Sequence, residues 1–327
     1  MKPKVIVYKK VDSTVIEYVR ETCEVIYFEK LDSQSLPSFY KELKDAEGIL
    51  GSGLKVDEKF LELAPQLKIV SNISVGYDNL DIPEITKRKI MATNTPEVLN
   101  DSVADTIFGL LLATARRMPE LNQMVKSGKW TSQVGENLYG VDVHHKTLGI
   151  IGMGGIGSAI AKRANYGFDM PILYHNRSRN LEAEQIYQAT YCSLEEICQH
   201  ADFICLMTPL TPKTVKLIGE KEFKLMKKSA IFVNGSRGAT VDEDALVQAL
   251  QNGDILAAGL DVFAQEPVSP DHPLLSMDNV VTLPHIGSAT YETRLKMAKV
   301  AAENLVHGLE GKQPLSLINQ DVLTEVH

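Results

Sequence analysis

An arginine, a glutamate and a histidine each follow a different apolar, strand-like run in the second half of the chain. Arg237, Glu266 and His285 stand just beyond the ends of these runs. Ligands of open α/β sheets bind beyond the carboxyl ends of the strands, so these side chains can converge. An arginine can bind a carboxylate through two hydrogen bonds, and a histidine can protonate a carbonyl oxygen. A carboxylate beside the imidazole favours its protonated form. The set predicts carbonyl reduction of a 2-keto acid.

Each of these residues also has a simpler interpretation. A lone arginine most often forms a surface ion pair, and a lone histidine is most often structural. Glu266 stands before Pro267 and could belong to a turn. The occurrence of all three in matching positions favours the catalytic interpretation.

A glycine-rich turn lies between an apolar run and a helix-like stretch. The turn reads GMGGIG at 152–157, which is the spacing G-x-G-x-x-G. Gly152 would make the tight turn, Gly154 would let a pyrophosphate approach the backbone, and Gly157 would let the helix pack on its strand. The N-terminus of the helix offers free N–H groups to the phosphates. We therefore expect a dinucleotide to bind here.

The next strand-like run ends without the acidic residue that usually binds the ribose of NAD. Its end offers Asn176, Arg177, Ser178 and Arg179 instead. Arginines and a serine can bind a 2′-phosphate through charge-assisted hydrogen bonds. The alternative interpretation is a solvated, charged turn. The pattern predicts a preference for NADP(H), with NAD possible.

Strand-like runs alternate with helix-like stretches along most of the chain, which predicts parallel sheets and an α/β fold. We expect two doubly wound domains, with a Rossmann nucleotide domain at 100–285 inserted into a flavodoxin-like substrate domain at 1–99 and 286–327. The expected helices include 106–116, capped by 101–105, and 291–309. The expected strands are 4–8, 24–28, 48–50, 68–71, 90–93, 148–152, 171–174, 202–207, 230–233, 257–260 and 280–283.

The segment from about 118 to 145 has weak periodicity and contains Trp130, the single tryptophan of the chain. A loop-rich arm of this kind often packs on a partner subunit. A local surface loop is the alternative interpretation that the pattern leaves open.

Composition excludes several classes of partner. The formal net charge is −8 and no lysine or arginine block occurs, which argues against nucleic acid and anionic membranes. The 4 cysteines form no CxxC pair and no metal-ligand spacing, so free thiols and no metal site are expected. The apolar run at the start is too short for a signal peptide, and no run approaches the ~20 residues of a membrane span. We expect a cytoplasmic protein.

Five blocks of the sequence stand out together, at 74–81, 152–157, 234–238, 259–267 and 284–290. In their content and order, these blocks resemble the D-isomer-specific 2-hydroxyacid dehydrogenase family, and the resemblance covers essentially the whole chain. Within the family, the glyoxylate/hydroxypyruvate reductases and the 2-ketogluconate reductases look most similar.

The resemblance implies roles for individual residues. Val75 and Gly76 would offer backbone N–H groups to the substrate carboxylate, and Arg237 would bridge that carboxylate and the carbonyl. His285 would act as acid and base with Glu266 as its partner, giving a D-2-hydroxy acid. The segment 118–145 would embrace a second subunit in a homodimer. The resemblance also implies cofactor contacts, with Asp261 holding the nicotinamide carboxamide. The expected cofactor contacts are Thr106, Gly155, Ile156, Thr208, Pro209, Ser236, Asp261, His285 and Gly287.

One segment departs from the family. Many relatives carry an arginine where this chain reads GSGL at 51–54. The missing cation disfavours a phosphorylated substrate. Two further alternatives remain: a D-lactate, phosphite or phosphoglycerate-type dehydrogenase with the same site, and a nucleotide-sensing transcriptional corepressor. The corepressor would need a peptide-binding surface, and no basic patch supports it.

Overall fold

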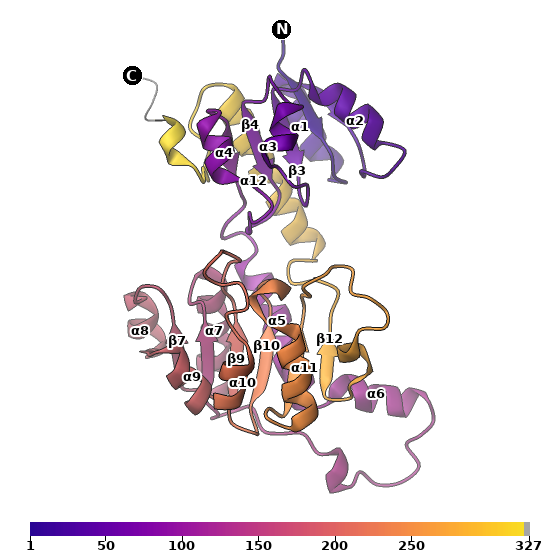
Figure 1. The fold of residues 1–327 in the computed structure, drawn as a ribbon, viewed down its shortest axis with the longest axis vertical. Helices are drawn as coiled ribbons and strands as arrows, with labels where there is room; N and C mark the ends of the chain where they lie inside the picture. Colours follow the sequence, from indigo (N-terminus) through magenta and orange to yellow (C-terminus); the bar gives the residue numbers. More distant parts are fainter. Residues whose placement is uncertain (324–327) are drawn as a thin grey trace. The chain divides into compact units, whose positions relative to one another are not determined.

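The chain forms two compact units, seen in a computed structural model that describes residues 1–323 (Figure 1). The first unit combines residues 1–99 with the chain from Ala289 onward, and the second is Asn100–Ser288. The first unit is therefore built from two separate stretches of sequence. Within the described residues, no helix has the length and apolar character needed to cross a bilayer.

The first unit is a five-stranded parallel sheet with the strand order β2-β1-β3-β4-β5. This is the 2-1-3-4-5 order of flavodoxin-like folds, as predicted. Its strands are β1 (Lys4–Val7), β2 (Glu24–Tyr27), β3 (Gly48–Gly51), β4 (Ile69–Asn72) and β5 (Met91–Thr93). Its helices are α1 (Ser13–Thr22), α2 (Leu36–Leu43), α3 (Glu58–Glu62), α4 (Ile82–Lys87) and α12 (Tyr291–Leu309), and a 3₁₀ turn, η4, spans Gln320–Leu323.

Helix α12 belongs to this unit although it comes from the far end of the sequence. It packs against β3, β4 and α1. Small buried side chains, among them Ala298, Ala301 and Ala302, let the helix approach the sheet closely. The Ser71 hydroxyl of β4 donates to the Ala301 carbonyl at 2.7 Å. The predicted helix 291–309 is confirmed to the residue.

The second unit is a seven-stranded parallel sheet with the order β12-β11-β10-β9-β6-β7-β8. Counted from β6, this order contains the 3-2-1-4-5-6 pattern of a Rossmann sheet, as predicted. The strands are β6 (Leu148–Ile151), β7 (Ile172–His175), β8 (Thr190–Tyr191), β9 (Phe203–Leu206), β10 (Ile231–Asn234), β11 (Ala257–Leu260) and β12 (Val280–Thr282). The helices are α5 (Asn100–Ala115), α6 (Met118–Lys126), α7 (Gly155–Phe168), α8 (Leu181–Tyr187), α9 (Leu194–His200), α10 (Glu220–Leu225) and α11 (Glu243–Asn252), with 3₁₀ turns η1 (Glu136–Leu138), η2 (Gly238–Thr240) and η3 (Pro273–Ser276).

Strands β6, β9, β10 and β11 are buried along their whole length. Helices cover both faces of a doubly wound sheet, so its central strands are apolar runs without alternation. This pattern is what made these strands predictable from the sequence.

The structure differs from the sequence analysis in three local details. The helix expected at 106–116 begins earlier, since α5 already starts at Asn100 and buries Val103 and Ala104. The supposed capping segment therefore forms the first turns of the helix. The arm at 118–145 contains α6, a helix with Pro119 in its first turn and no buried residue. The exposed two-residue strand β8 was missed, because so short an edge strand leaves no apolar pattern.

Candidate active site

His285 and Glu266 form a hydrogen-bonded pair beyond the carboxyl ends of two neighbouring strands. Nδ1 of His285 lies 2.7 Å from Oε2 of Glu266. Strand β12 ends shortly before His285, and β11 ends before the loop that carries Glu266. The side chains are 46% and 37% exposed, so solvent and small molecules can reach the pair. With Nδ1 bound to the carboxylate, Nε2 is the ring nitrogen left to face a substrate.

Asp261 fixes the backbone that carries the histidine. Its two carboxylate oxygens accept hydrogen bonds from the N–H groups of Ile286 and Gly287, at 2.8 and 2.9 Å. The side chain is buried, and this burial raises the pKa of Asp261 while the two backbone bonds oppose the rise. His285 has a φ of 54°, a left-handed conformation that costs energy in a non-glycine residue. The bonds to Asp261 hold the neighbouring residues in place.

The segment of Arg237 packs directly against the loop of Glu266. A Cβ on Gly238 would come within 1.8 Å of the Phe263 carbonyl carbon and 2.1 Å of the Ala264 nitrogen, so only glycine fits there. Strands β10, β11 and β12 are neighbours in the sheet. The structure therefore places Arg237, Glu266 and His285 along one sheet edge, as the sequence pattern predicted.

Two side chains that the sequence analysis missed hold these segments. Asn234, at the end of β10, donates to the Arg237 carbonyl at 3.1 Å. Glu243, at the start of α11, accepts from the Ala264 N–H at 2.7 Å and so anchors the loop of Glu266. Asn234 lies inside the block 234–238 but was assigned no role, and Glu243 is 21 residues from the Ala264 backbone that it anchors, so its own neighbourhood carries no signal.

The glycine turn has the shape that a pyrophosphate requires. Gly152 has a φ of 106°, and a Cβ there would lie 2.7 Å from Met207. A Cβ on Gly157 would lie 2.3 Å from the Gly152 oxygen, whereas nothing approaches a Cβ on Gly154 within 4 Å. Helix α7 begins at Gly155 without a side-chain cap, so its first N–H groups are free for an anion. The predicted dinucleotide fits this turn.

The polar side chains at the end of β7 differ in whether they bond within the protein or are exposed to solvent. Asn176 exchanges hydrogen bonds with the backbone of Met153 at 3.1 and 3.2 Å and so ties this strand end to the glycine turn. Arg179 forms a two-bond ion pair with Glu184. Arg177 and Ser178 are exposed. Of the two arginines, Arg179 therefore has a carboxylate partner, whereas no carboxylate among the described residues pairs with Arg177.

The remaining predicted cofactor residues differ in what their polar groups do. The Thr208 hydroxyl is buried without a hydrogen-bond partner, as expected of a group that awaits a ligand. The Pro209 carbonyl accepts from the Thr214 hydroxyl at 2.6 Å. Thr106 donates to the Gly287 carbonyl at 3.2 Å. The Ser236 hydroxyl is buried within its own turn, where it bonds to Asn234 at 2.8 Å.

In the first unit, the loop after β4 presents main-chain donors. Three successive carbonyls are tied back: Ser74 to the Thr95 N–H at 2.9 Å, Val75 to the Asn94 amide at 2.9 Å, and Gly76 to the Asn72 amide at 3.0 Å. In a trans peptide, the C=O of one residue and the N–H of the next point in opposite directions. The N–H groups of Val75 and Gly76 therefore point away from these anchors.

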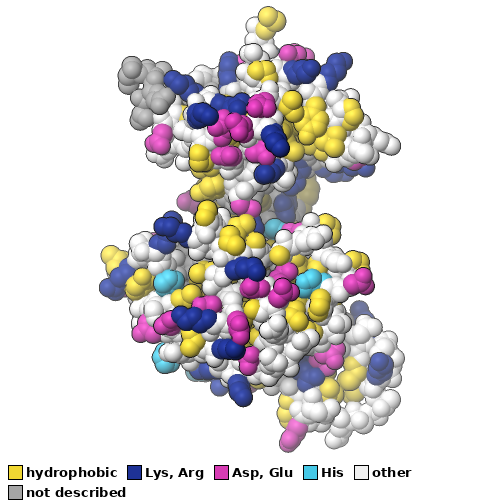
Figure 2. Space-filling view, viewed as in Figure 1, with side chains coloured by type: hydrophobic (Ala, Val, Ile, Leu, Met, Phe, Trp, Pro, Cys, Tyr) yellow, Lys and Arg dark blue, Asp and Glu magenta, His cyan; other side chains and the backbone are white. Residues whose placement is uncertain are grey.

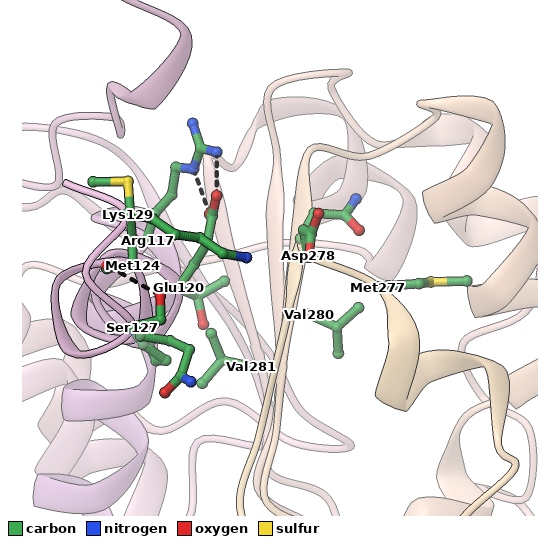
Figure 3. A pocket seen from close by; sticks show the side chains of 13 residues that line it. Arg117, Glu120, Met124, Ser127, Lys129, Met277, Asp278, Val280 and Val281 are labelled. Atoms are coloured by element: carbon green, nitrogen blue, oxygen red, sulfur yellow. Dashed lines mark hydrogen bonds and ion pairs between the residues drawn. The ribbon is translucent and has the colours of Figure 1, made fainter. Parts of the chain in front are cut away.

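A hollow of about 390 Å³ on the second unit is not part of this constellation (Figure 3). Arg117, Glu120, Met124 and Lys129 line one side, and Met277 to Val281 line the other. Those last residues precede and begin β12, whereas His285 follows its carboxyl end. The hollow therefore belongs to the arm and lies at the opposite end of that strand.

Comparison with known proteins identifies the class. Residues 108–287 match the D-isomer specific 2-hydroxyacid dehydrogenase, NAD binding domain. A glyoxylate/hydroxypyruvate reductase B from Escherichia coli is 51% identical over 322 residues, covering 98% of this chain and 99% of the relative. Among solved structures, an NADPH-dependent glyoxylate/hydroxypyruvate reductase from Sinorhizobium meliloti, in complex with NADP and malonate, has a TM-score of 0.85 at 34% identity, with 97% of both chains covered. A glyoxylate reductase from Paecilomyes thermophila has a TM-score of 0.88 at 30% identity, covering 98% of this chain and 99% of its own.

The chain therefore belongs to the D-isomer specific 2-hydroxyacid dehydrogenase family. Its second unit is the NAD-binding domain of that family. The protein is an NAD(P)-dependent oxidoreductase, as the sequence predicted.

Proposed function

We propose that the protein reduces small 2-keto acids, namely glyoxylate, hydroxypyruvate and 2-ketogluconate, to D-2-hydroxy acids with a preference for NADPH. The observation that carries this proposal is the 2.7 Å bond between His285 and Glu266, on backbone anchored by Asp261. An imidazole held in this way is suited to give a proton to a carbonyl oxygen. The substrates named in the relatives' descriptions support the choice of keto acid.

In the proposed mechanism, the substrate carboxylate binds to the N–H groups of Val75 and Gly76 and to the Arg237 guanidinium. NADPH, when bound, supplies the hydride that adds to C2 of the keto acid. His285 donates the proton from Nε2 to the carbonyl oxygen, so the C=O double bond becomes a C–O–H group. The carboxylate of Glu266 stabilises the imidazolium before transfer, and solvent restores the proton afterwards.

For the cofactor, we propose that the first N–H groups of α7 hold the pyrophosphate and that Thr208 binds through its buried hydroxyl. Arg177, with Ser178, would bind the 2′-phosphate of NADPH. Arg179 would act indirectly, because it is paired with Glu184. The two N–H bonds that Asp261 accepts leave lone pairs on its oxygens for the nicotinamide carboxamide.

We also propose that the arm joins two copies of the chain into a homodimer. Figure 2 shows apolar side chains interspersed with polar and charged ones on this segment, and Met118, Val125, Trp130 and Tyr139 are 52–61% exposed. Exposed aromatic and methionine side chains are enriched in protein interfaces. Trp130→Glu should shift the protein from dimer to monomer in sedimentation equilibrium, whereas a monomeric wild type would contradict the proposal.

The proposed location is the cytoplasm. All four cysteines, Cys23, Cys192, Cys198 and Cys205, are free thiols. This state fits a reducing compartment.

A substrate panel tests the proposed activity. Glyoxylate, hydroxypyruvate, 2-ketogluconate and pyruvate would each be assayed with NADPH and with NADH. We expect turnover of the first three, with a higher kcat/KM for NADPH. A higher kcat/KM for NADH would refute the assignment of Arg177, and no turnover of the first three acids would refute the assigned substrates.

A further inference from the structure

Among residues 1–323, two cations without an acidic partner lie at the carboxyl edge of the first unit's sheet. Lys9 follows β1, and its ammonium donates to the Ser52 hydroxyl at the end of β3. Arg294 lies in the first turn of α12. Burial lowers the pKa of Lys9, and the charge of Arg294 contributes to the lowering.

The contacts of α12 place Arg294 at this edge independently of any titration. One turn earlier, the Tyr291 hydroxyl donates to the carboxylate of Asp12, which caps the N-terminus of α1. Helix α1 begins just after β1, so its N-terminus lies at the carboxyl edge of the sheet. Asp12 is the acid nearest to Lys9 in the sequence, and its carboxylate oxygens accept hydrogen bonds from Thr14 and Tyr291.

Within residues 1–323, no carboxylate forms an ion pair with Lys9 or Arg294. Both side chains are only partly exposed, and burial lowers the pKa of each. Two neighbouring, half-buried cations that repel each other are costly without a counter-charge. An arrangement of this kind is stabilised by a ligand that brings oxygen acceptors.

The pair is close to the loop that presents the N–H groups of Val75 and Gly76. Strands β3 and β4 are neighbours, with Gly51 in register with Asn72, and the Ile73 N–H donates to the Gly51 carbonyl at 2.7 Å. Ser52, to which the Lys9 ammonium is bonded, therefore follows a strand that lies about 5 Å from the strand leading into that loop. Glyoxylate has no atom beyond its aldehyde group to offer the pair, whereas a longer acid has.

We propose that Lys9 and Arg294 form a subsite for oxygen atoms at the far end of a longer 2-keto acid, either sugar-acid hydroxyls or a second carboxylate. This inference rests on the proposed function, since it assumes that the substrate carboxylate binds to Val75 and Gly76. The segment 51–54 lacks the arginine of many relatives, and the cations come instead from the two ends of the chain. The subsite selects for substrate length and polarity and leaves the reaction itself unchanged.

The test compares substrates of matched length. The kcat/KM values for 2-ketoglutarate, which ends in a carboxylate, and 2-ketogluconate, which carries hydroxyls, would be divided by the value for 2-ketovalerate, which ends in a methyl group. At least one ratio should exceed about 10 in the wild type and fall by about 10-fold in Lys9→Met and in Arg294→Met, because charge-assisted hydrogen bonds contribute on that scale. The ratio that responds identifies whether the carboxylate or the hydroxyls are recognised.

Glyoxylate serves as the internal control, because it should keep its kcat/KM within about 2-fold in both variants. Lys9→Arg and Arg294→Lys preserve the charge and should retain most of the preference, and Lys55→Met controls for loss of an exposed lysine. Equal ratios in the wild type, ratios unchanged in both Met variants, or an equal loss for glyoxylate would each overturn the subsite. A wild type that reduces longer acids with these preferences but not glyoxylate would refute the proposed substrates and leave the subsite standing.

Discussion

The two units present different kinds of chemical group at the carboxyl edges of their sheets. The second unit presents side chains, since His285, Glu266 and Arg237 stand at the ends of three neighbouring strands. The first unit presents the backbone N–H groups of Val75 and Gly76. The loop that carries them is oriented by hydrogen bonds from Asn94, Thr95 and Asn72 to its carbonyls. Chemistry that needs a proton requires a titratable side chain, whereas a fixed carboxylate can be held by any peptide that points the right way.

The difference predicts how each region fails. A substitution in the second unit should remove a reacting group and lower kcat. A substitution in the first unit should tilt a donor that any residue could supply, and it should act mainly on KM. Four experiments sharpen this contrast, in order of decreasing effect.

His285→Ala should lower kcat by ~10²–10⁴, the usual contribution of a positioned acid. The backbone around Asp261 does not depend on the imidazole, so NADPH affinity measured by fluorescence titration should change little. Steady-state kinetics with glyoxylate provide the measurement. Near-complete activity in this variant would show that another group delivers the proton.

Asn94→Ala should lower kcat/KM by about 10- to 100-fold, chiefly by raising KM. The Val75 carbonyl loses its hydrogen bond, so the N–H of Gly76 in the same peptide is no longer held in its orientation. Asn279→Ala is the matched control, since Asn279 makes an amide-to-carbonyl bond of the same kind to Leu256 at 3.1 Å. The control should leave both constants unchanged. A loss confined to kcat would place Asn94 with the reacting groups and break the contrast.

Arg177→Ala should lower the ratio of kcat/KM for NADPH to that for NADH by about 10-fold, as expected for one charge-assisted contact to a phosphate. Arg179→Ala should have a smaller effect on this ratio, because Arg179 is paired with Glu184. The KM for the keto acid should stay constant in both. The reverse order of effects would show that Arg179 leaves its ion pair to bind the cofactor.

The smallest effect concerns acid stability. The bonds from Arg179 and Tyr174 lower the pKa of Glu184 to about 2. A carboxyl group whose folded pKa is depressed stabilises the protein above its unfolded pKa, near 4.3, and this stabilisation is lost as pH falls toward about 2. Glu184→Gln should therefore lose less thermal stability than the wild type between pH 5 and 3. Equal losses in a differential scanning experiment would show that Glu184 does not contribute.

The sequence by itself determined the parallel sheets, the glycine turn and the strand-end positions of the three side chains that we propose to react. Buried strands are uninterrupted apolar runs, the turn requires glycines at fixed spacing, and acid chemistry requires particular residue types. These features are written in consecutive residues. Helix α6 was not predicted because it buries no side chain. The start of α5 was predicted too late because the residues of its first turns also suit a capping segment.

Only the tertiary structure decided which side chains anchor the loops of the proposed reacting groups, and which charged side chains are already held in ion pairs. Asn94 bonds to a loop that begins 20 residues before it, and Glu243 bonds to a loop 21 residues after it. Arg179 forms an ion pair with Glu184. Lys9 and Arg294 lie at the same sheet edge although almost the whole chain separates them. Such contacts depend on where strands end in space, and a residue that acts on distant backbone leaves no periodicity or spacing in its own neighbourhood.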